Sequence, residues 1–423
     1  MAQKLEHVVL AYSGGLDTSV AIPWIKEQYG AEVTTLTVDV GQEGELGDAI
    51  DRATRNGAKG ALFVDAKESF ATEFLLPAIK ANALYQGVYP LSTALARPLI
   101  VRHLVAAAQQ VKADTVAHGC TGKGNDQVRF DVGVQTLAPH LHIVAPVREW
   151  NMNRPDEILY AREHGLAIHV KPESPYSVDE NLWGRSVEGG CLEDAATAPP
   201  EEVFQWTGHP DTWPSEPQDV TIGFESGVPV SLDGKALPLV ALIQELNATA
   251  GKHGVGRIDH VEDRVVGIKS RETYECPAAI TLILAHQALE ALVLPRDVRS
   301  VKTPLEQRWG ELVYGGSWYT PLREALSAFI EKTQETVAGE VTVRLFQGSA
   351  RVVGRKSAYS LLAKELATYE RTSTFPQEAA EGFIHLYGLA NRLAYVRQRE
   401  AQSAHAGGAG EVAPSPVPEP SSS

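Results

Sequence analysis

Short apolar runs alternate with longer amphipathic stretches over the first 170 residues of the chain. The short runs are rich in β-branched residues and predict strands at residues 7–11, 33–40, 61–65, 115–119 and 142–146. The stretches between them predict helices at residues 18–29, 47–57, 68–83, 94–111 and 155–164. Strands that alternate with helices form βαβ units. We therefore expect an α/β fold with a doubly wound, mostly parallel sheet that helices cover on both faces.

A different pattern begins near residue 171 and indicates a second, α+β region. Residues 171–190, KPESPYSVDENLWGRSVEGG, are polar and have no clear period, so we expect a long loop. Residues 220–232 and 341–355 alternate around short polar turns and predict two β-hairpins, the first turning at Ser226-Gly227. Near the C-terminus an apolar stripe predicts an amphipathic helix that packs on its own domain or on another subunit. Its residues are Phe383, Leu386, Tyr387, Ala390 and Leu393.

Composition limits the class of protein and its ligands. The chain has 423 residues, of which 43% are hydrophobic and 22% charged, which is typical of a globular protein with two or three domains. It has no apolar run of about 18 residues, and charged residues follow Met1 closely, so we expect a cytoplasmic protein without a membrane span or signal peptide. Cys120, Cys191 and Cys276 are too far apart for a zinc ribbon and are expected to be packing residues. The net charge is −15 and no Lys/Arg-rich run occurs, which favours small-molecule ligands over nucleic acid.

A glycine-rich turn, AYSGGLDTS at residues 11–19, joins the first predicted strand to the first predicted helix. Glycines there can serve a simple tight turn, because glycine adopts positive φ without strain. Alternatively, the free N–H groups at the start of the helix bind an anion. The hydroxyls of Ser13, Thr18 and Ser19 beside the glycines favour phosphate binding. The turn lacks the lysine of a Walker A loop, and neither TGKG at 121–124 nor a GxGxxG fingerprint ending at Gln127 completes another nucleotide motif.

The SGGLDTS sequence resembles the PP-loop of the ATP pyrophosphatase family, which implies cleavage of ATP between its α- and β-phosphates. Four further stretches are similar to argininosuccinate synthases: YPLSTALARP (89–98), HGCTGKGNDQVRF (118–130), SPYSVDENLWGRSVEGG (174–190) and GRIDHVEDRVVGIKSRETYECPA (256–278). The resemblance implies an AMP-forming ligase of arginine biosynthesis that joins L-citrulline to L-aspartate with MgATP, through citrullyl-AMP, and releases diphosphate. It also implies a homotetramer without a prosthetic group or a dedicated metal site.

The resemblance also assigns the parts of the chain and the residues of the site. It implies a nucleotide-binding domain (1–170), a synthetase and multimerisation domain (171–375), an oligomerisation helix (376–400) and a disordered tail (401–423). The implied ATP-binding residues are Ala11, Tyr12, Ser13, Gly14, Gly15, Leu16, Asp17, Thr18, Ser19, Val38 and Gly119. The implied aspartate-binding residues are Thr121, Asn125 and Asp126, and those for citrulline are Tyr89, Asn125, Arg129, Ser177, Ser186, Glu262 and Tyr274. Asp17, Asn125 and Asp126 are the candidates for a catalytic role.

These side chains suit zwitterionic substrates, although simpler interpretations remain open. A guanidinium such as that of Arg129 can pair bidentately with a carboxylate, whereas Glu262 and Asp126 suit ammonium groups. Asn125-Asp126 can instead cap the helix that follows, and Glu262 can pair with Arg264. The chain departs from common family residues at Ala94, where some members have serine, and at Val38 and Cys120, where alanine is common.

Two rival functions agree with the loop alone. One is another PP-loop ligase, acting on tRNA or with ammonia from glutamine. The other is a regulatory protein that senses ATP without turnover.

Overall fold

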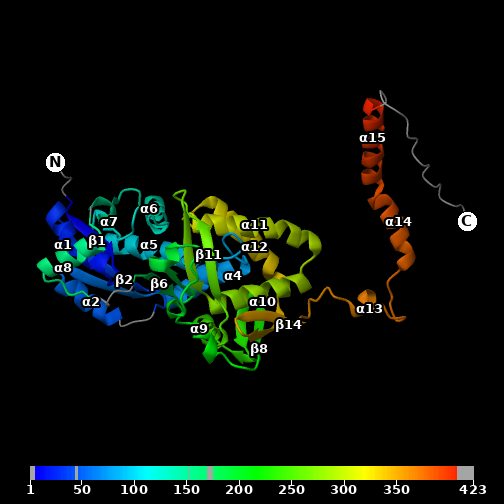
Figure 1. Ribbon diagram of the computed structural model, residues 1–423, viewed down its shortest axis with the longest axis horizontal. Coiled ribbons are helices and arrows are strands. Elements are labelled where there is room, and N and C mark those ends of the chain that lie inside the picture. Colours follow the sequence, from blue (N-terminus) through cyan, green and yellow to red (C-terminus); the bar gives the residue numbers. More distant parts are fainter. Residues whose placement is uncertain (1–4, 43–45, 151, 169–174, 407–423) are drawn as a thin grey trace, which may run out of the picture. The chain divides into compact units, whose positions relative to one another are not determined.

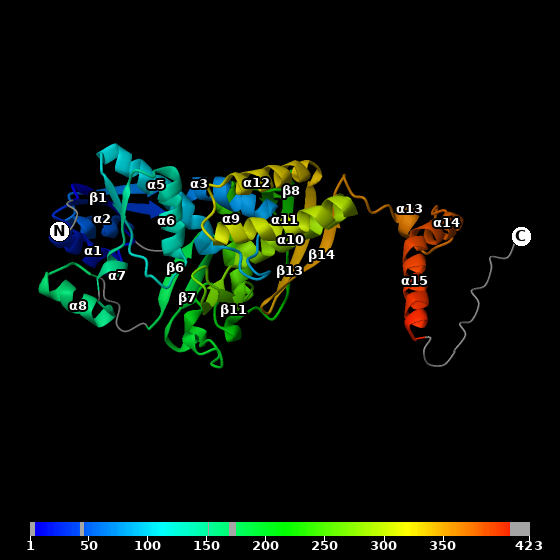
Figure 2. The same ribbon diagram turned by 90° about the horizontal axis from the view of Figure 1, so that it is seen from above.

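The computed structural model describes residues 5–42, 46–150, 152–168 and 175–406. The chain separates into two compact units, Met1–Leu361 and Leu362–Ser423. Figures 1 and 2 show the larger unit, with its sheets and covering helices, from two directions.

A five-stranded parallel sheet forms the N-terminal part of the larger unit. Its strands are β1 (His7–Ala11), β2 (Glu32–Asp39), β3 (Gly60–Asp65), β4 (Thr115–Ala117) and β5 (His142–Val144), in the order β3-β2-β1-β4-β5. The parallel sheet and the five strands predicted from the apolar runs are confirmed. β4 and β5 end earlier than predicted, because β4 leads into the turn at Gly119 and Pro146 begins a helix after β5.

Helices cover both faces of this sheet, as the continuous apolar runs indicated. Val9 of β1 belongs to a core shared with α5 (Ser92–Val111), whereas Val8 and Leu10 point to the opposite core, shared with α1 (Leu16–Tyr29). The other helices here are α2 (Leu46–Arg55), α3 (Lys67–Phe70), α4 (Leu76–Lys80), α6 (Asp126–Leu137), α7 (Pro146–Glu149) and α8 (Arg154–Glu163). A π-turn, Ala71–Leu75, divides the helix predicted at 68–83, and it lies next to Pro77, which lacks a backbone donor.

A four-stranded antiparallel sheet corrects one sequence prediction. It contains β6 (Ser177–Asn181), β7 (Gly184–Glu188), β11 (Arg257–Asp263) and β12 (Lys269–Glu275), in the order β11-β12-β7-β6. The long loop expected at residues 171–190 is therefore wrong for the segment that forms β6 and β7, while 169–174 lies outside the described residues. The strands were missed because β7 pairs with β12, far along the chain, and one face of the hairpin carries polar side chains.

A second five-stranded sheet completes the larger unit, with the order β10-β9-β8-β13-β14. Its strands are β8 (Gln218–Glu225), β9 (Val228–Leu232), β10 (Lys235–Ala236), β13 (Gly339–Phe346) and β14 (Ser349–Lys356). Both predicted hairpins are confirmed: Ser226 and Gly227 have φ of 48° and 75°, and Gln347 and Gly348 have 42° and 78°, as type I′ turns require. The helices of this region are α9 (Leu239–Lys252), α10 (Pro277–Val293), α11 (Arg296–Tyr314) and α12 (Pro321–Thr333), with 3-10 turns at Gly190–Glu193, Glu201–Val203, Pro210–Thr212 and Gln334–Thr336.

The smaller unit is helical, with α13 (Lys364–Ala367), α14 (Gln377–Tyr387) and α15 (Leu389–Ala406). The predicted apolar stripe lies on α14 and α15, which meet at Gly388. Its side chains are exposed, for example Phe383 at 62% and Leu386 at 71%. α15 continues to Ala406, further than expected, and residues 407–423 lie outside the described part of the chain. No helix within the described ranges has the length and apolar character needed to cross a bilayer.

Candidate active site

The glycine-rich turn lies at the point of the parallel sheet where ligands usually bind. β1 and β4 are neighbours, and the chain continues from β1 toward β2 on one side and from β4 toward β5 on the other. The crevice beyond the carboxyl ends of such a pair of strands is open to a ligand. The turns after β1 and β4 meet there, because a Cβ placed on Gly119 would lie 3.0 Å from Cγ2 of Thr18. The structure therefore brings Gly119 against the loop, as expected for two parts of one site.

The loop itself presents uncapped backbone donors. Gly15 occupies the N-cap position of α1, and no side chain caps this helix end. Gly14 has a φ of 77°, which glycine adopts without strain. Ser13 Oγ accepts a hydrogen bond from Gly15 N at 3.3 Å and lies 3.2 Å from Thr18 Oγ1. The first turn of α1 thus offers N–H groups and two hydroxyls to an anion.

The remaining predicted ATP-binding residues differ in how they are placed. Ser19 is fully buried, and its Oγ lies 3.0 Å from the phenol oxygen of Tyr12, so its hydroxyl faces the core rather than the loop opening. Ala11 ends β1, Leu16 begins α1 and Val38 is buried in β2. Ala11 and Leu16 therefore border the loop on its two sides.

Arg52 on α2 lies against the loop and was not found by the sequence analysis. A Cβ placed on Gly14 would lie 3.0 Å from Nη2 of Arg52. Within the described ranges Arg52 forms no ion pair, and its buried Nε has no hydrogen-bond partner. A lone arginine in an amphipathic helix carries no sequence signal for such a position.

Glu157 on α8 faces the loop aspartate and was also missed. It is 5% exposed and forms a side-chain hydrogen bond with Asp17. Burial, together with the charge and hydrogen bond of Asp17, raises the pKa of Glu157 to about 8. The capping box of Asn153 and Asp156 fixes the start of α8 and thereby the position of Glu157.

Asn125 connects three parts of the larger unit. It occupies the N-cap position of α6, but its side chain does not cap the helix, so the capping interpretation is wrong for Asn125. Instead its Nδ2 donates to the phenol oxygen of Tyr314 at 2.7 Å, and its Oδ1 accepts from Val265 N at 2.9 Å. Nδ2 is also 3.4 Å from Glu262 Oε1. Asn125 therefore joins the turn after β4 to α11 and to the end of β11.

Asp126 lies between two arginines, of which only Arg129 was predicted. Oδ1 is 2.8 Å from Arg129 Nη1, and Oδ2 is 2.8 Å from Arg97 Nη2, which also lies 2.9 Å from Asp179 Oδ2. Although burial raises the pKa of Asp126, the two guanidinium groups lower it overall. Arg97 lies within the YPLSTALARP motif, so the motif was informative, but no local pattern pointed to this arginine.

Arg129 retains a donor for a ligand. Its Nε donates to the Tyr314 carbonyl at 3.0 Å and its Nη1 to Asp126, whereas its buried Nη2 has no partner among the described residues. The side chain is 4% exposed. A buried guanidinium with an open N–H is suited to a carboxylate.

The four-stranded sheet presents the predicted citrulline residues on one face. Directly paired residues of an antiparallel sheet share a face, and every second residue along a strand returns to it. The pairing register places on this face Ser177, Asp179, Ser186, Glu188, Glu262, Glu272 and Tyr274. Tyr89 stacks on Tyr274 with ring centroids 4.2 Å apart and accepts from Thr93 N at 2.9 Å. Of the predicted residues, Thr121 and Ser177 are exposed, whereas Tyr89, Tyr274 and Ser186 are buried.

Glu262 is held by two phenols rather than by an arginine. It is 1% exposed and accepts from Tyr314 at 2.7 Å and from Tyr274 at 2.8 Å. Arg264 pairs with Glu188 and Glu272, so the alternative of a Glu262–Arg264 ion pair is wrong. Glu272 and Tyr314 were missed by the sequence analysis, the latter because it lies outside every motif.

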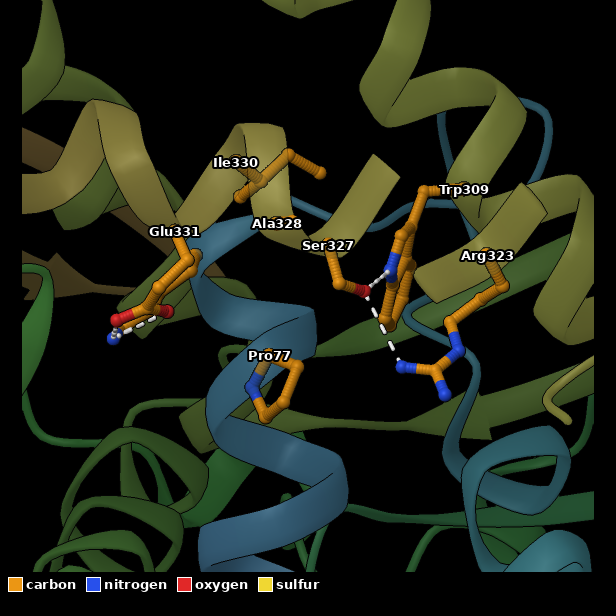
Figure 3. A pocket seen from close by; sticks show the side chains of 8 residues that line it. Pro77, Trp309, Arg323, Ser327, Ala328, Ile330 and Glu331 are labelled. Carbon is orange, nitrogen blue, oxygen red and sulfur yellow. Dashed lines mark hydrogen bonds and ion pairs between the residues drawn. The ribbon is translucent and has the colours of Figure 1, made fainter. Parts of the chain in front are cut away.

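A separate cavity of about 260 Å³ lies between α4, α11 and α12 (Figure 3). Its lining residues are Pro77, Lys80, Trp309, Arg323, Ser327, Ala328, Ile330 and Glu331, and none of the predicted site residues is among them. In Figure 3, Ser327 accepts from Trp309 Nε1 at 2.8 Å. Over the described ranges, no group of three or more His, Cys, Asp or Glu side chains is placed to hold a metal ion.

Comparison with known proteins agrees with the motifs. The arginosuccinate synthase N-terminal HUP domain matches residues 7–167, and the arginosuccinate synthase C-terminal domain matches residues 176–394. The argininosuccinate synthase of Rubrobacter xylanophilus is 57% identical over 397 residues, which cover 94% of this chain and 97% of that protein. The enzyme of Pyrococcus furiosus is 56% identical over 388 residues, which cover 92% of this chain and 94% of that protein.

A solved U34-tRNA thiolase from Methanococcus maripaludis is much more distant. It is 16% identical, with a TM-score of 0.25 over 41% of this chain and 61% of that one. The full-length similarity to the synthases confirms the family and the ligase class inferred from the motifs, and it decides against both rival functions. The chain belongs to the argininosuccinate synthase family.

Proposed function

We propose that the residues gathered between the parallel sheet and the four-stranded sheet carry out the family reaction in two steps. In the first, the ureido oxygen of citrulline attacks the α-phosphorus of ATP and diphosphate leaves. In the second, the amine of aspartate attacks the citrullyl-AMP carbon and AMP leaves. In this proposal the nucleotide binds to the domain of residues 1–170, and the amino acids bind where residues of this domain meet those of the synthetase domain, 171–375. Holding the reactants in attack geometry contributes up to about 7–11 kcal/mol to such reactions.

The diphosphate binds at the loop of Ser13, Gly14 and Gly15. The uncapped N–H groups of α1 and the hydroxyls of Ser13 and Thr18 point to this place. The helix dipole alone contributes only about 0.3–1 kcal/mol, so a full positive charge adds strongly to the site. We assign this charge to Arg52, whose guanidinium touches Gly14 and has no counter-charge among the described residues. The leaving diphosphate gains negative charge as the bond breaks, and fixed donors stabilise it.

The Mg²⁺ that accompanies ATP fits this site as an ion held mainly by phosphate oxygens. Asp17 and Glu157 are the only carboxylates that we place at the described part of the loop, and two carboxylates do not form a protein cage. When bound, Mg²⁺ neutralises phosphate charge. Asp17 is the residue that would contact it or one of its waters.

The assignment of the citrulline site depends on one observation: a buried guanidinium and a buried carboxylate lie in the same part of the site. Arg129 has a buried open N–H for the citrulline α-carboxylate, and Glu262 is a buried carboxylate for the α-ammonium. Asn125 bonds to Tyr314 and approaches Glu262, so it lies between the citrulline residues and the aspartate residues. Thr121 and Asp126 then receive aspartate on the far side of Asn125.

We also propose that the protein acts in the cytoplasm as a homotetramer in which α14 and α15 pack on other copies of the chain. The exposed apolar stripe of these helices supports this assembly, because contiguous exposed apolar side chains usually mark an interface.

The function is tested by product analysis of the purified protein with MgATP, citrulline and aspartate, each omitted in turn. We expect AMP, diphosphate and argininosuccinate together, and argininosuccinate only when all three substrates are present. Formation of ADP and phosphate, or turnover that does not need citrulline, would contradict the proposal.

A further inference from the structure

Two carboxylates, the buried Glu262 and the half-buried Glu272, share one phenol in the candidate citrulline site. The hydroxyl oxygen of Tyr274 lies 2.8 Å from Glu262 Oε2 and 2.8 Å from Glu272 Oε2. Glu272 is on the same strand and face as Tyr274, and its side chain is 15% exposed. A phenol has a single hydrogen to donate, so it cannot satisfy two ionised carboxylates at once.

The hydrogen bonds around the pair decide which carboxylate carries a proton. Glu262 accepts from Tyr314 at Oε1 and from Tyr274 at Oε2, so both of its oxygens already have donors. Tyr314 in turn accepts from Asn125. The contact between the Tyr274 hydroxyl oxygen and Glu272 Oε2 then has no hydrogen of its own, because the phenol hydrogen goes to Glu262. It becomes a hydrogen bond only if Glu272 Oε2 is protonated and donates to the Tyr274 oxygen. Glu272 Oε1 meanwhile accepts from Arg264 at 3.2 Å. A continuous chain of hydrogen bonds then runs from Glu272 to Asn125.

The balance of charge around Glu272 supports the same assignment. Burial and the negative charges of Glu262 and Glu188 raise its pKa to about 8, against the opposing effects of the Tyr274 hydrogen bond and of Arg264. Charged or titratable groups face it from its own strand and from the neighbouring elements. They are Tyr274 on β12, His260 and Glu262 on β11, Glu188 on β7, Arg264 after β11, and Tyr314 on α11 beyond Glu262. Arg264 is the guanidinium that contacts Glu272 directly, and it also contacts Glu188.

We propose that Glu262 and Glu272 together bind the α-ammonium of citrulline, and that a proton held by Glu272 in the free enzyme passes to solvent as the ammonium binds. The inference rests on the proposed function and adds a second carboxylate to the citrulline site. The ammonium supplies the positive charge that this cluster lacks, so both carboxylates are ionised in the complex. An analogue without the amino group brings no such charge, and the pair therefore selects α-amino acids.

The test is the pH dependence of kcat/KM for citrulline in the wild type and in Glu272→Gln. Glutamine keeps the shape and can donate to Tyr274, but it cannot ionise. With a pKa of about 8, the ionised fraction of Glu272 rises about tenfold between about pH 7 and about pH 9. We expect the ratio of kcat/KM for citrulline, wild type over variant, to rise about tenfold over the same range. The ratio cancels every titration that the two enzymes share, including that of the substrate amines.

A matched control is Glu306→Gln, which removes another largely buried carboxylate of raised pKa, paired with Lys302 away from this site. Its ratio to the wild type should stay flat with pH. A flat ratio for Glu272→Gln, or a wild-type profile with no rise through about pH 8, would overturn the inference. The wild-type profile tests the inference even if the variant does not fold. Failure of the proposed function is seen separately, because the wild type would then form no argininosuccinate at any pH.

Discussion

Arg97 and Asp126 meet through two nitrogens and one oxygen: Nη2 and Nε of Arg97 lie 2.8 and 2.9 Å from Asp126 Oδ2. The other oxygen of Asp126 is taken by Arg129, and the Arg97 guanidinium also reaches Asp179 on β6. Arg97 therefore connects α5, α6 and the β6–β7 hairpin. In the proposed function it positions Asp126 for the ammonium of aspartate without needing to touch the substrate.

Arg97→Lys tests this positioning role. A lysine keeps the charge but is a single point donor, so it cannot hold Asp126 and Asp179 together. We expect kcat/KM for aspartate to fall about tenfold or more, because a hydrogen bond to a charged group contributes about 1.5–3 kcal/mol. Arg102→Lys is the matched control, since Arg102 lies on the same helix and pairs at the surface with Glu73. Equal values of kcat/KM for Arg97→Lys and Arg102→Lys would count against the role.

Arg129→Lys tests the citrulline carboxylate site. Arg129 uses Nε and Nη1 for Tyr314 and Asp126, which leaves Nη2 for a ligand. A lysine cannot make all three contacts, so we expect KM for citrulline to rise about 10- to 100-fold with a smaller change in KM for ATP. Initial rates with each substrate varied in turn measure this. An unchanged KM for citrulline would show that the carboxylate binds elsewhere.

The apolar pattern was enough to predict the parallel sheet, because its strands are short local runs and the three central strands, β2, β1 and β4, are mostly buried. It was not enough for the β6–β7 hairpin, because β7 pairs with β12 much later in the chain and the site face of the hairpin carries Asp179 and Ser186. Strand pairing over such distances leaves no local period. Local signals were reliable again at the hairpin turns, where Ser226 and Gly227 form the two-residue turn between β8 and β9.

The residues of the candidate site also fall into two groups, those that a sequence motif predicted and those that only the structure revealed. Motifs supplied the residues that lie in short, recognisable stretches of this chain, such as SGGLDTS, and the structure brings most of them together. Arg52, Glu157 and Tyr314 lie on helices outside these stretches, and only the fold places them at the site. A buried charge has no periodic signature, so its role becomes visible only once its partners are known.

Glu157→Gln tests the carboxylate pair at the loop through stability. Because the pKa of Glu157 is higher in the folded state than in the unfolded state, binding of its proton stabilises the fold. This contribution is complete at a pH below about 4.5 and is lost as the pH rises through about 8. Above this window Glu157 has lost its proton, and its negative charge is destabilised by burial and by Asp17 beside it. We expect Glu157→Gln to melt at the same temperature as the wild type near about pH 5 and at a higher temperature near about pH 9. The control is Glu163→Gln, at the exposed end of α8, for which the difference in Tm should not depend on pH.

Leu386→Asp tests the assembly. Leu386 is 71% exposed on α14, so the substitution should leave the larger unit stable while it places a charge in the proposed interface. We expect a shift from tetramer to smaller species in light scattering after size-exclusion chromatography. Glu381→Ala, on the same helix, is the control and should remain a tetramer. A wild type that is already monomeric would contradict the proposed homotetramer directly.

Arg52→Ala tests whether this arginine binds the leaving diphosphate. Its guanidinium touches Gly14 and has no described counter-charge, so its loss should weaken ATP binding and slow the step in which diphosphate leaves. We expect KM for ATP to rise about tenfold, because a hydrogen bond to a charged group contributes at least about 1.4 kcal/mol, which corresponds to a factor of ten in affinity. We also expect kcat to fall and the inhibition constant of added diphosphate to rise. Arg55→Ala is the matched control, one helical turn along α2 and exposed. If Arg52→Ala changes only Tm, as a purely structural residue would, and leaves the inhibition constant of diphosphate unchanged, Arg52 does not bind the phosphates.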